Sequence, residues 1–406
     1  MTAPPLLGIR VAVHANGVAA AYAGRMLATL GATCVLVEGP GGSALRREPP
    51  FLPFSPSPSG EGVGGWGLSG GVEQSGQTPP PTPPLKGRGV SALFAYLCAG
   101  MTAQTIDLAA DRAALTALLT DSLIFIDDTP VADRAALGLD PETIAAAHPA
   151  LIHVSILPFG ATGPKADWLG EEINVLHASG EGYLLPNGLT TELFPDRPPV
   201  KVHGHFTAMQ GGTAAALGAL SALWVRDSLN ETGAGGQFVD VSSQDAGLAV
   251  GAFAIQRLGD GSIEHRVERS FRFGGVIECA DGFVELLTLE QRQWHGLVKL
   301  LGDPAWAQDP ALEDNLERSR RGAEINVHIR AWAKLRKVED VVREGQRLSV
   351  PLAKYYSPAE VLADSHEACR GLFQSVAIPG AGELPILVSP FHIDGAPLVL
   401  AEGPPA

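Results

Sequence analysis

The chain has 406 residues, of which 45% are hydrophobic and 18% are charged, so it has the composition of an ordinary globular protein with room for two cores. Its formal net charge of −15 argues against a nucleic-acid or anionic-membrane surface, because both partners need clustered Lys and Arg. The four cysteines have no paired spacing, which argues against a metal site, and no apolar run resembles a signal or membrane segment. We therefore expect a cytoplasmic protein.

Strands and helices alternate along the first part of the chain. Apolar runs predict buried strands at 8–13, 33–37, 122–126 and 151–156. Between them we expect helices over 17–30 with Asn16 as the cap, over 112–119 after Asp111, and one that begins at Asp140-Pro141. Such alternation is typical of an α/β fold whose parallel sheet is covered by helices on both faces.

The second part of the chain is predicted to hold more varied elements. In order, we expect an Ala/Gly-rich helix at 206–227, a turn at 232–237, a strand at 238–242, a hairpin at 275–287, helices at 291–348 and short strands in the tail at 373–406. The small residues of the first of these helices suit close packing against a neighbouring element.

Residues 49–90 interrupt the pattern. They contain ten Pro, ten Gly and four charged side chains, with no strong hydrophobic periodicity. Such a segment cannot bury enough apolar surface to offset the entropy of ordering it. We therefore predict a disordered surface insertion that can be deleted, with a functional lid as the alternative.

The segment most informative about function begins with SILPFGATGP at 155–164 and continues with GEEINVLHASG at 170–180. A Gly/Pro-rich loop after an apolar strand, followed by an acidic pair that opens a helix, resembles the active-site segment of the family III CoA-transferases. That family includes carnitine CoA-transferase, formyl-CoA transferase and 2-methylacyl-CoA racemase. Its acidic residue is usually Asp and forms a covalent acyl intermediate, and Glu172 stands at the matching position.

Four further segments match the family in order and spacing, at 22–38, 137–139, 232–242 and 360–373. Together they identify the chain as a member. The resemblance implies a Rossmann-like α/β domain with a smaller α+β domain, and a dimer whose subunits interlock as rings. The implied division is a large domain over 1–200, a helical connection over 201–264, a small domain over 265–350 and a return to the large domain over 351–406.

The resemblance also implies CoA or acyl-CoA as a substrate rather than a permanently bound cofactor. Arg46 and Arg47 lie near the expected CoA entrance, and Asn16 stands where the family has Arg or Gln. These three residues are the candidate CoA-binding residues.

Several departures from the family fall where its members contact CoA. Leu36, Met101 and Asp128 stand where the family has cationic or polar residues. Phosphates favour Arg side chains and the N–H groups of helix N-termini. The substitutions should therefore weaken CoA binding.

Glu172 is the leading candidate for the nucleophile, because a carboxylate can attack a thioester carbonyl and hold the acyl group. Its extra methylene moves the oxygens by roughly 1 Å relative to Asp, which matters for a near-attack geometry. Glu171 is a second candidate or a helper. The alternative interpretation is an acid at a helix N-terminus, stabilised by the helix dipole.

Two other sequence patterns could indicate a metal site or a nucleotide-binding site. His203 and His205 lack convincing carboxylate or Cys partners in the sequence, so we expect a capping or interface role and no metal site. Glu38 ends a strand like a ribose-binding acid, but residues 13–18 contain no GxGxxG. A nicotinamide dehydrogenase is therefore disfavoured.

The leading functional hypothesis is transfer of CoA from an acyl-CoA to a free carboxylic acid through Glu172. The alternative is a catalytically reduced family member that acts as a structural or partner subunit of a heteromeric CoA-transferase. In either case we expect an oligomer, which is a homodimer or a heteromer with a related subunit. A 2-methylacyl-CoA racemase is the third hypothesis. It needs an acid and a base on opposite faces of the α-carbon, and the sequence assigns no second group to that role.

Overall fold

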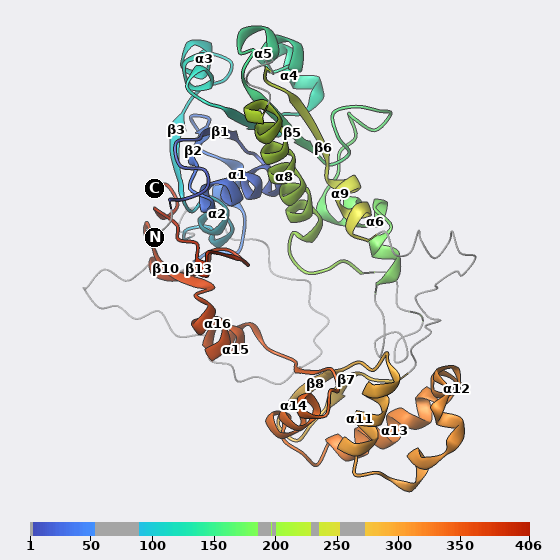
Figure 1. Cartoon of the computed structure of the whole chain (residues 1–406). Coiled ribbons are helices and arrows are strands. Elements are labelled where there is room, and N and C mark those ends of the chain that lie inside the picture. The colour runs from blue at the N-terminus through green and yellow to red at the C-terminus, as the bar shows by residue number, and fades with distance from the viewer. Residues whose placement is uncertain (1–2, 53–88, 186–195, 197–199, 229–234, 252–272) are drawn as a thin grey trace, which may run out of the picture. The chain divides into compact units, whose positions relative to one another are not determined.

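The computed structural model describes residues 3–52, 89–185, 196, 200–228, 235–251 and 273–406. Contacts divide the chain into two compact units, drawn in Figure 1. The first comprises Met1–Val175, His203–Gly247 and Ala368–Ala406, and the second comprises Leu176–Val202 and Leu248–Glu367. Within the described residues, no helix has the length and apolarity needed to cross a membrane.

A six-stranded parallel sheet forms the centre of the first unit, in the order β3-β2-β1-β4-β5-β6 (Figure 1). Its strands are β1 (Arg10–His14), β2 (Thr33–Glu38), β3 (Met101–Thr105), β4 (Ile124–Asp127), β5 (Ile152–Leu157) and β6 (Phe238–Ser242). The direction of strand order reverses between β1 and β4, which pair in parallel with Val11 opposite Ile124. The expected α/β class with a parallel sheet is confirmed.

The edge strand β3 has no counterpart among the predicted strands. Its sequence, MTAQT, is buried only at Met101, and the four residues that follow are exposed. A criterion based on apolar runs misses such a strand, because an edge strand needs few apolar side chains.

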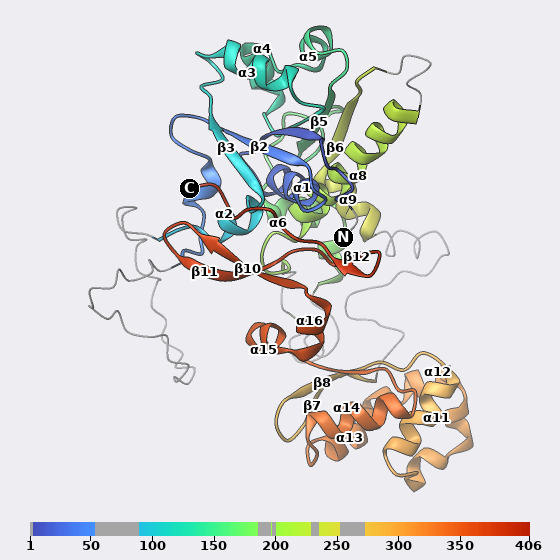
Figure 2. The ribbon, with the colours of Figure 1, turned by 60° about the vertical axis from the view of Figure 1, so that its left-hand side comes forward.

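Helices cover both faces of the sheet (Figure 2). The two helices α1 (Val18–Thr29) and α8 (Phe206–Ser228) pack on one face. On the other face lie α3 (Arg112–Thr120), α4 (Val131–Leu137) and α5 (Pro141–Ala147).

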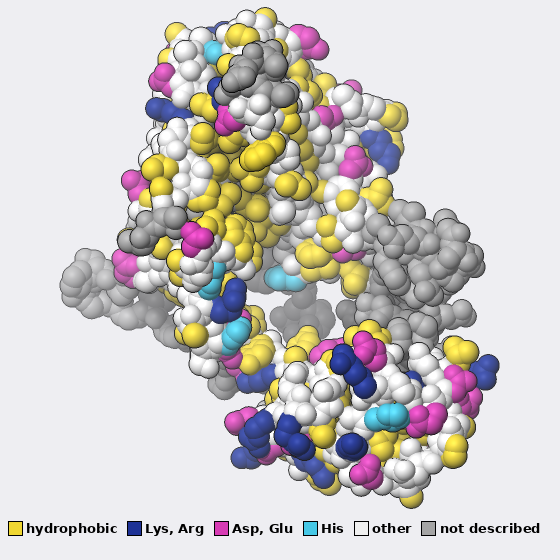
Figure 3. Space-filling model, in the orientation of Figure 1, with side chains coloured by type: hydrophobic (Ala, Val, Ile, Leu, Met, Phe, Trp, Pro, Cys, Tyr) yellow, Lys and Arg dark blue, Asp and Glu magenta, His cyan; other side chains and the backbone are white. Residues whose placement is uncertain are grey.

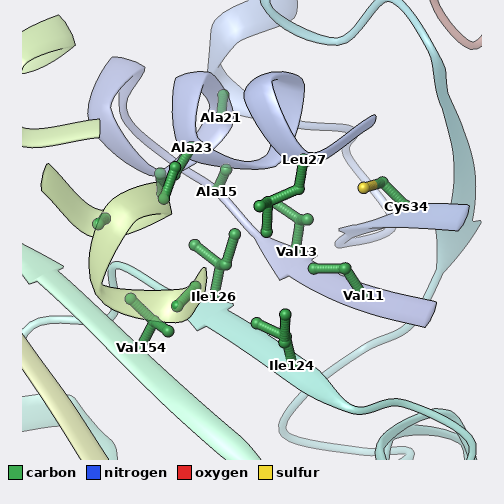
Figure 4. Close-up of a cluster of buried hydrophobic side chains, with 14 of the residues drawn as sticks. Val11, Val13, Ala15, Ala21, Ala23, Leu27, Cys34, Ile124, Ile126 and Val154 are labelled. Atoms are coloured by element: carbon green, nitrogen blue, oxygen red, sulfur yellow. The ribbon is translucent and has the colours of Figure 1, made fainter. Parts of the chain in front are cut away.

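The strands divide their side chains between the two faces. Val11 and Val13 belong to the core beneath α1 and α8, where Ile126 and Val154 join them (Figure 4). Ala12, between them in sequence, belongs to the core on the opposite face. This alternation follows from the two-residue period of a strand, and it buries β1 on both faces.

The contact between α1 and α8 depends on glycine. A Cβ placed on Gly212 would lie 2.6 Å from the carbonyl oxygen of Ala19 and 3.1 Å from the side chain of Tyr22, so a larger residue does not fit. Gly212 lies in the second turn of α8 and Ala19 in the first turn of α1. The two helices therefore meet close to their N-termini, and the predicted close packing of this helix is confirmed.

The predicted helix caps are confirmed at two of three positions. Asp111 accepts a hydrogen bond from Ala114 N–H, and Asp140 accepts one from Thr143 N–H. The prediction that Asn16 caps α1 is wrong: Gly17 is the N-cap. The start of α1 is instead bound by Asp128, which lies 112 residues away from Asn16 in sequence.

The C-terminal tail returns to the first unit. The hairpin of β10 (Phe373–Ile378) and β11 (Gly382–Leu387) packs on α2 (Ala92–Leu97), with β12 (His392–Ile393) and β13 (Ala396–Pro397) after it. Buried Arg25 of α1 donates to the carbonyl oxygens of Ala99 at 3.0 Å and Leu387 at 2.6 Å. This side chain ties the first helix to the tail.

The second unit is built around its own core. The predicted hairpin is confirmed as β7 (Gly275–Glu278) and β8 (Phe283–Leu286), and β9 (Leu352–Lys354) completes the antiparallel sheet. The helices described between 273 and 370 are α11 (Gln291–Leu300), α12 (Asn315–Arg320), α13 (Gly322–Ala333), α14 (Val338–Arg347), α15 (Pro358–Ala363) and α16 (Ser365–Arg370), which spans the boundary of the two units. Trp294 is 1% exposed at the centre of this core.

The contact units differ from the predicted domain boundaries in the placement of α8. The family resemblance implies a connection over 201–264, whereas His203–Gly247 belongs to the first contact unit. The physical reason is the contact of α8 with α1 and with β5 and β6 of the sheet.

The ends of the predicted insertion meet. Residues 53–88 lie outside the described residues, but Phe51 forms an antiparallel bridge with Ser91. Leu52 N–H donates to the Val90 carbonyl at 2.7 Å, and both side chains pack against the cluster beneath the C-terminal hairpin. The disorder predicted for 49–90 is therefore wrong at both ends of that range, because those ends form a paired base.

This paired base gives a sharp deletion test. Replacing residues 53–88 with a single Asn creates an Asn-Gly turn between Leu52 and Val90, the favoured two-residue hairpin connection. We expect the melting temperature to stay within about 3 °C of wild type. The matched deletion of 49–90 removes the bridge and should lower it further; a loss of folding in the shorter deletion would contradict this expectation.

Candidate active site

Glu172, the predicted nucleophile, is the first residue of α6 (Glu172–Ala178), and its side chain reaches the start of α8. Thr207 N–H donates to Oε1 at 2.8 Å, and Ala208 N–H donates to Oε2 at 3.1 Å. Both carboxylate oxygens are therefore bound in the first turn of a 23-residue helix. A helix N-terminus favours negative charge, so the arrangement stabilises the carboxylate.

This contact refines the alternative interpretation of Glu172 as a helix-terminal acid. The helix that the carboxylate binds is α8, not α6, which it opens. The longer side chain of Glu has the reach to span the two elements. Asp would withdraw the oxygens by roughly 1 Å, enough to break hydrogen bonds of this length.

Glu171, the second candidate, has a different setting. Its backbone N–H donates to the Asn174 side chain at 3.0 Å, and its carbonyl accepts from Val175 N–H at 3.0 Å. These bonds start α6, while the Glu171 residue is exposed. A helper role for its carboxylate stays a prediction.

The loop that carries Glu172 is fastened to the neighbouring strand β6. Asp240 accepts a hydrogen bond from Ala161 N–H at 2.7 Å and another from the Thr162 hydroxyl at 2.9 Å. Sequence reasoning missed Asp240, because 78 residues separate it from Thr162. The available signal was its place in the strand after the turn at 232–237, beside the strand that leads to the site.

A second carboxylate binds the start of α1. Asp128 accepts hydrogen bonds from Asn16 N–H at 2.8 and 3.0 Å, from Gly17 N–H at 2.6 Å and from the Asn16 side-chain amide at 3.2 Å. This point lies between β1 and β4, where the strand order reverses and doubly wound folds bind ligands. Asn16, a predicted CoA-binding residue, is therefore engaged by an internal anion.

The protonation of Asp128 is sensitive to its surroundings. Burial raises the pKa of Asp128 to about 6, although His14 and the N–H groups of Asn16 and Gly17 act in the opposite direction. Burial alone would lower the pKa of His14, but its hydrogen bond to Asp127 and the charges of both aspartates raise it.

Asp127, the neighbouring carboxylate at the end of β4, is fully buried and contacts side chains of the two adjacent strands, β1 and β5. Its oxygens lie 3.2 Å from His14 Nδ1 and 3.5 Å from His153 Nε2, and the Thr129 hydroxyl donates to it at 2.6 Å. Burial opposes ionisation, but the interactions with His14, His153 and Thr129 outweigh it and hold the pKa of Asp127 well below its usual range. Arg134 Nη2 lies 3.8 Å away and adds a positive charge.

Arg46 and Arg47, the other predicted CoA-binding residues, follow β2 on a short 3₁₀ helix (Ala44–Arg47). Arg46 forms a bidentate ion pair with Glu38 at 2.7 and 2.8 Å and lies over the Phe94 ring. Burial of Glu38 is outweighed by this pair and by Ser43 N–H, so the pKa of Glu38 is lowered. Arg47 is exposed and donates to the Gly41 carbonyl.

Two of the three residues that differ from the family pattern lie in the hydrophobic core. Leu36 is 0% exposed and Met101 is 1% exposed, within the cluster beneath α1. A cation at either position in this chain would be buried among apolar side chains. The weakening of CoA binding predicted from the sequence therefore rests on Asp128 alone among these three residues.

The two histidines near α8 occupy its approach. His203 is exposed, and the His205 carbonyl accepts from Met209 N–H at 3.0 Å at the start of the helix. Among the described residues, no three His, Cys, Asp or Glu side chains gather into a group that could hold a metal ion.

Comparison with known proteins places this geometry in a family. The sequence model of CoA-transferase family III matches residues 6–406. The chain belongs to CoA-transferase family III. The fold agrees, because the crystal structure of a CAIB/BAIF family protein from Brucella suis superposes with a TM-score of 0.78 and 25% identity, covering 99% of this chain and 96% of that one.

Two relatives of this family III chain share about a quarter of its residues. It is 26% identical to the succinate–glutarate CoA-transferase of Agrobacterium fabrum over 97% of its length and 91% of that protein. It is also 26% identical to a probable CoA-transferase of Mycobacterium tuberculosis over 88% of its length, but spans only 40% of that relative. The CoA-transferases of family III move CoA between acyl-CoA thioesters and carboxylic acids.

Proposed function

We propose that this chain transfers CoA from an acyl-CoA to a free carboxylic acid, with Glu172 as the residue that carries the acyl group. The observation that supports the proposal most directly is the carboxylate of Glu172, at the family's acidic position, held by two N–H groups of α8. The proposed chemistry uses Glu172 as a carboxylate nucleophile, and the two N–H groups hold both of its oxygens at the start of α8.

The proposed reaction proceeds in three balanced exchanges. A Glu172 oxygen attacks the thioester carbonyl, the C–S bond breaks, and CoA leaves as a thiolate while a mixed anhydride forms. The acceptor carboxylate then attacks the Glu172 acyl carbon and releases the first acid. Finally the thiolate attacks the acceptor's carbonyl carbon, which forms the new thioester and restores the Glu172 carboxylate.

A specific observation favours the second candidate function, a catalytically reduced partner subunit. Asp128 occupies the N-terminus of α1 at the carboxyl ends of the central strands β1 and β4, a position suited to a ligand phosphate. An acyl-CoA that used these N–H groups would have to displace an internal anion. The racemase hypothesis receives no comparable support from the described residues.

Substitution of Glu172 tests the chemistry. Glu172→Gln should abolish transfer, because an amide is a far poorer nucleophile. Glu172→Asp should lower turnover at least about tenfold, because the shorter side chain loses its position against α8. The measurement is CoA exchange across a panel of acyl-CoAs and acids, with circular dichroism as the folding control. Full activity of the Gln variant would overturn the nucleophile assignment, and inactivity of wild type on the whole panel would favour the partner-subunit function.

Calorimetry tests the effect of Asp128 on CoA affinity. We expect wild type to bind CoA with Kd above about 100 μM at pH 7.5. Asp128→Asn should bind more tightly, because it removes the competing charge. Wild-type affinity should also rise toward Asn-variant affinity as the pH falls through about 6, where Asp128 becomes protonated. Asp107→Asn, an exposed loop acid, is the matched control. Submicromolar binding by wild type would contradict the electrostatic argument.

Assembly is the other part of the proposal. Exposed large apolar residues on α8 include Leu217 at 65% and Trp224 at 75% exposure, and apolar side chains gather on the face of the first unit seen in Figure 3. We expect a dimer in light scattering after size-exclusion chromatography, because such side chains favour a protein contact. A monomer of 42.3 kDa at nanomolar concentration would contradict it, and co-purification of a related subunit would favour a heteromer.

A further inference from the structure

The carboxylate of Asp240 on β6 joins this edge strand to the loop that follows β5. It accepts one hydrogen bond from a backbone N–H, that of Ala161, and one from the Thr162 hydroxyl. The loop turns sharply here, since Gly160 has φ of +83°. A Cβ on Gly160 would lie 3.5 Å from an Asp240 oxygen and 3.4 Å from the Ser242 Cβ, so the backbone passes close against β6.

The same loop is tied a second time to the segment after β6. Gln244 N–H donates to the Pro158 carbonyl at 3.0 Å, and Lys165 Nζ donates to the Gln244 side chain at 3.4 Å. The Lys165 ammonium also lies over the rings of Phe159 and Trp168, which contact one another edge to face. The loop is thus a folded unit fastened to β6 and α9 (Ser243–Val250).

The far end of the loop packs tightly at Gly170, two residues before Glu172. A Cβ on Gly170 would lie 2.9 Å from Phe159, 2.9 Å from Pro158 and 3.1 Å from Val175. Movement of the loop at Pro158 and Phe159 must therefore displace Gly170. Glu172 follows two residues later, and its carboxylate depends on alignment with Thr207 and Ala208 N–H.

We infer that Asp240 is a positioning residue for the reaction: it fixes the β5–α6 loop so that the Glu172 carboxylate stays on the N-terminus of α8. Hydrogen bonds to a carboxylate are stronger than those between neutral groups, so Asp240 resists displacement of the loop more than Asn would. A shift of about 1 Å at the nucleophile is enough to cost a large factor in rate. The kinetic part of this inference rests on the proposed function, whereas the geometric part does not.

Hydrogen exchange tests the geometric part without any assumption about activity. The amides of Thr207 and Ala208 are in the first turn of α8, and Glu172 is their acceptor. We expect Asp240→Ala to speed their exchange about tenfold or more, and Glu172→Ala, which removes the acceptor itself, should do the same. Thr162→Val, which deletes only the hydroxyl partner, should give a smaller increase. Asp107→Ala, which removes an acid that likewise accepts two loop N–H groups, should leave both amides unchanged.

Kinetic and hydrogen-exchange measurements together distinguish failure of the Asp240 inference from failure of the proposed function. With an active acyl-CoA substrate, Asp240→Ala should lower kcat about tenfold and leave KM within twofold, and Asp240→Asn should recover part of kcat. Unchanged Thr207 and Ala208 exchange in a folded Asp240→Ala variant would overturn the inference whether or not the enzyme is active. If exchange rises as expected and wild type transfers no CoA, Asp240 positions Glu172 as inferred and only the proposed function fails.

Discussion

The close approach of α8 to α1 is the constraint on which the candidate site depends. Because Gly212 has no side chain, the second turn of α8 lies against the carbonyl of Ala19 in the first turn of α1. The two helix N-termini are thereby held near one another, each facing a loop that leaves the sheet. The N-terminus of α1 receives the Asp128 carboxylate from directly after β4, and that of α8 receives the Glu172 carboxylate from the start of α6.

These two acids meet the same physical need with different consequences. The first N–H groups of any helix need an acceptor, and a carboxylate supplies one with a charge that suits the dipole. Asp128 meets this need with four hydrogen bonds at a position suited to ligand phosphate, so a phosphate there has to replace all of them. Among the described residues Glu172 meets it with two bonds, one on each oxygen, so within that part of the chain each oxygen keeps a lone pair for chemistry.

Local signals in the sequence were sufficient to predict most helices and strands and to select Glu172 as the acid at the centre of the candidate site. Apolar runs located four of the six strands of the parallel sheet, 238–242 located a fifth, and Asp111 and Asp140 were recognised as caps. The contacts that give Glu172, Asp128 and Asp240 their settings join residues 35, 112 and 79 positions apart, and no local pattern encodes such pairs. The burial of Leu36 and Met101 was missed for the same reason, since it is decided by α1 packing over the sheet.

The hydrogen bonds from α8 to Glu172 affect both the formation and the breakdown of the proposed anhydride. Hydrogen bonds accepted by a carboxylate are stronger than those accepted by a neutral oxygen, so the two N–H groups of α8 bind the Glu172 carboxylate more strongly than they would bind the neutral anhydride. Formation of the anhydride removes the charge and with it most of that stabilisation, which slows acylation and raises the energy of the intermediate. The same free energy is recovered when the thiolate returns and the carboxylate re-forms. An arrangement of this kind therefore favours a short-lived intermediate and limits its loss to water, provided that the loop keeps Glu172 in line with Thr207 and Ala208.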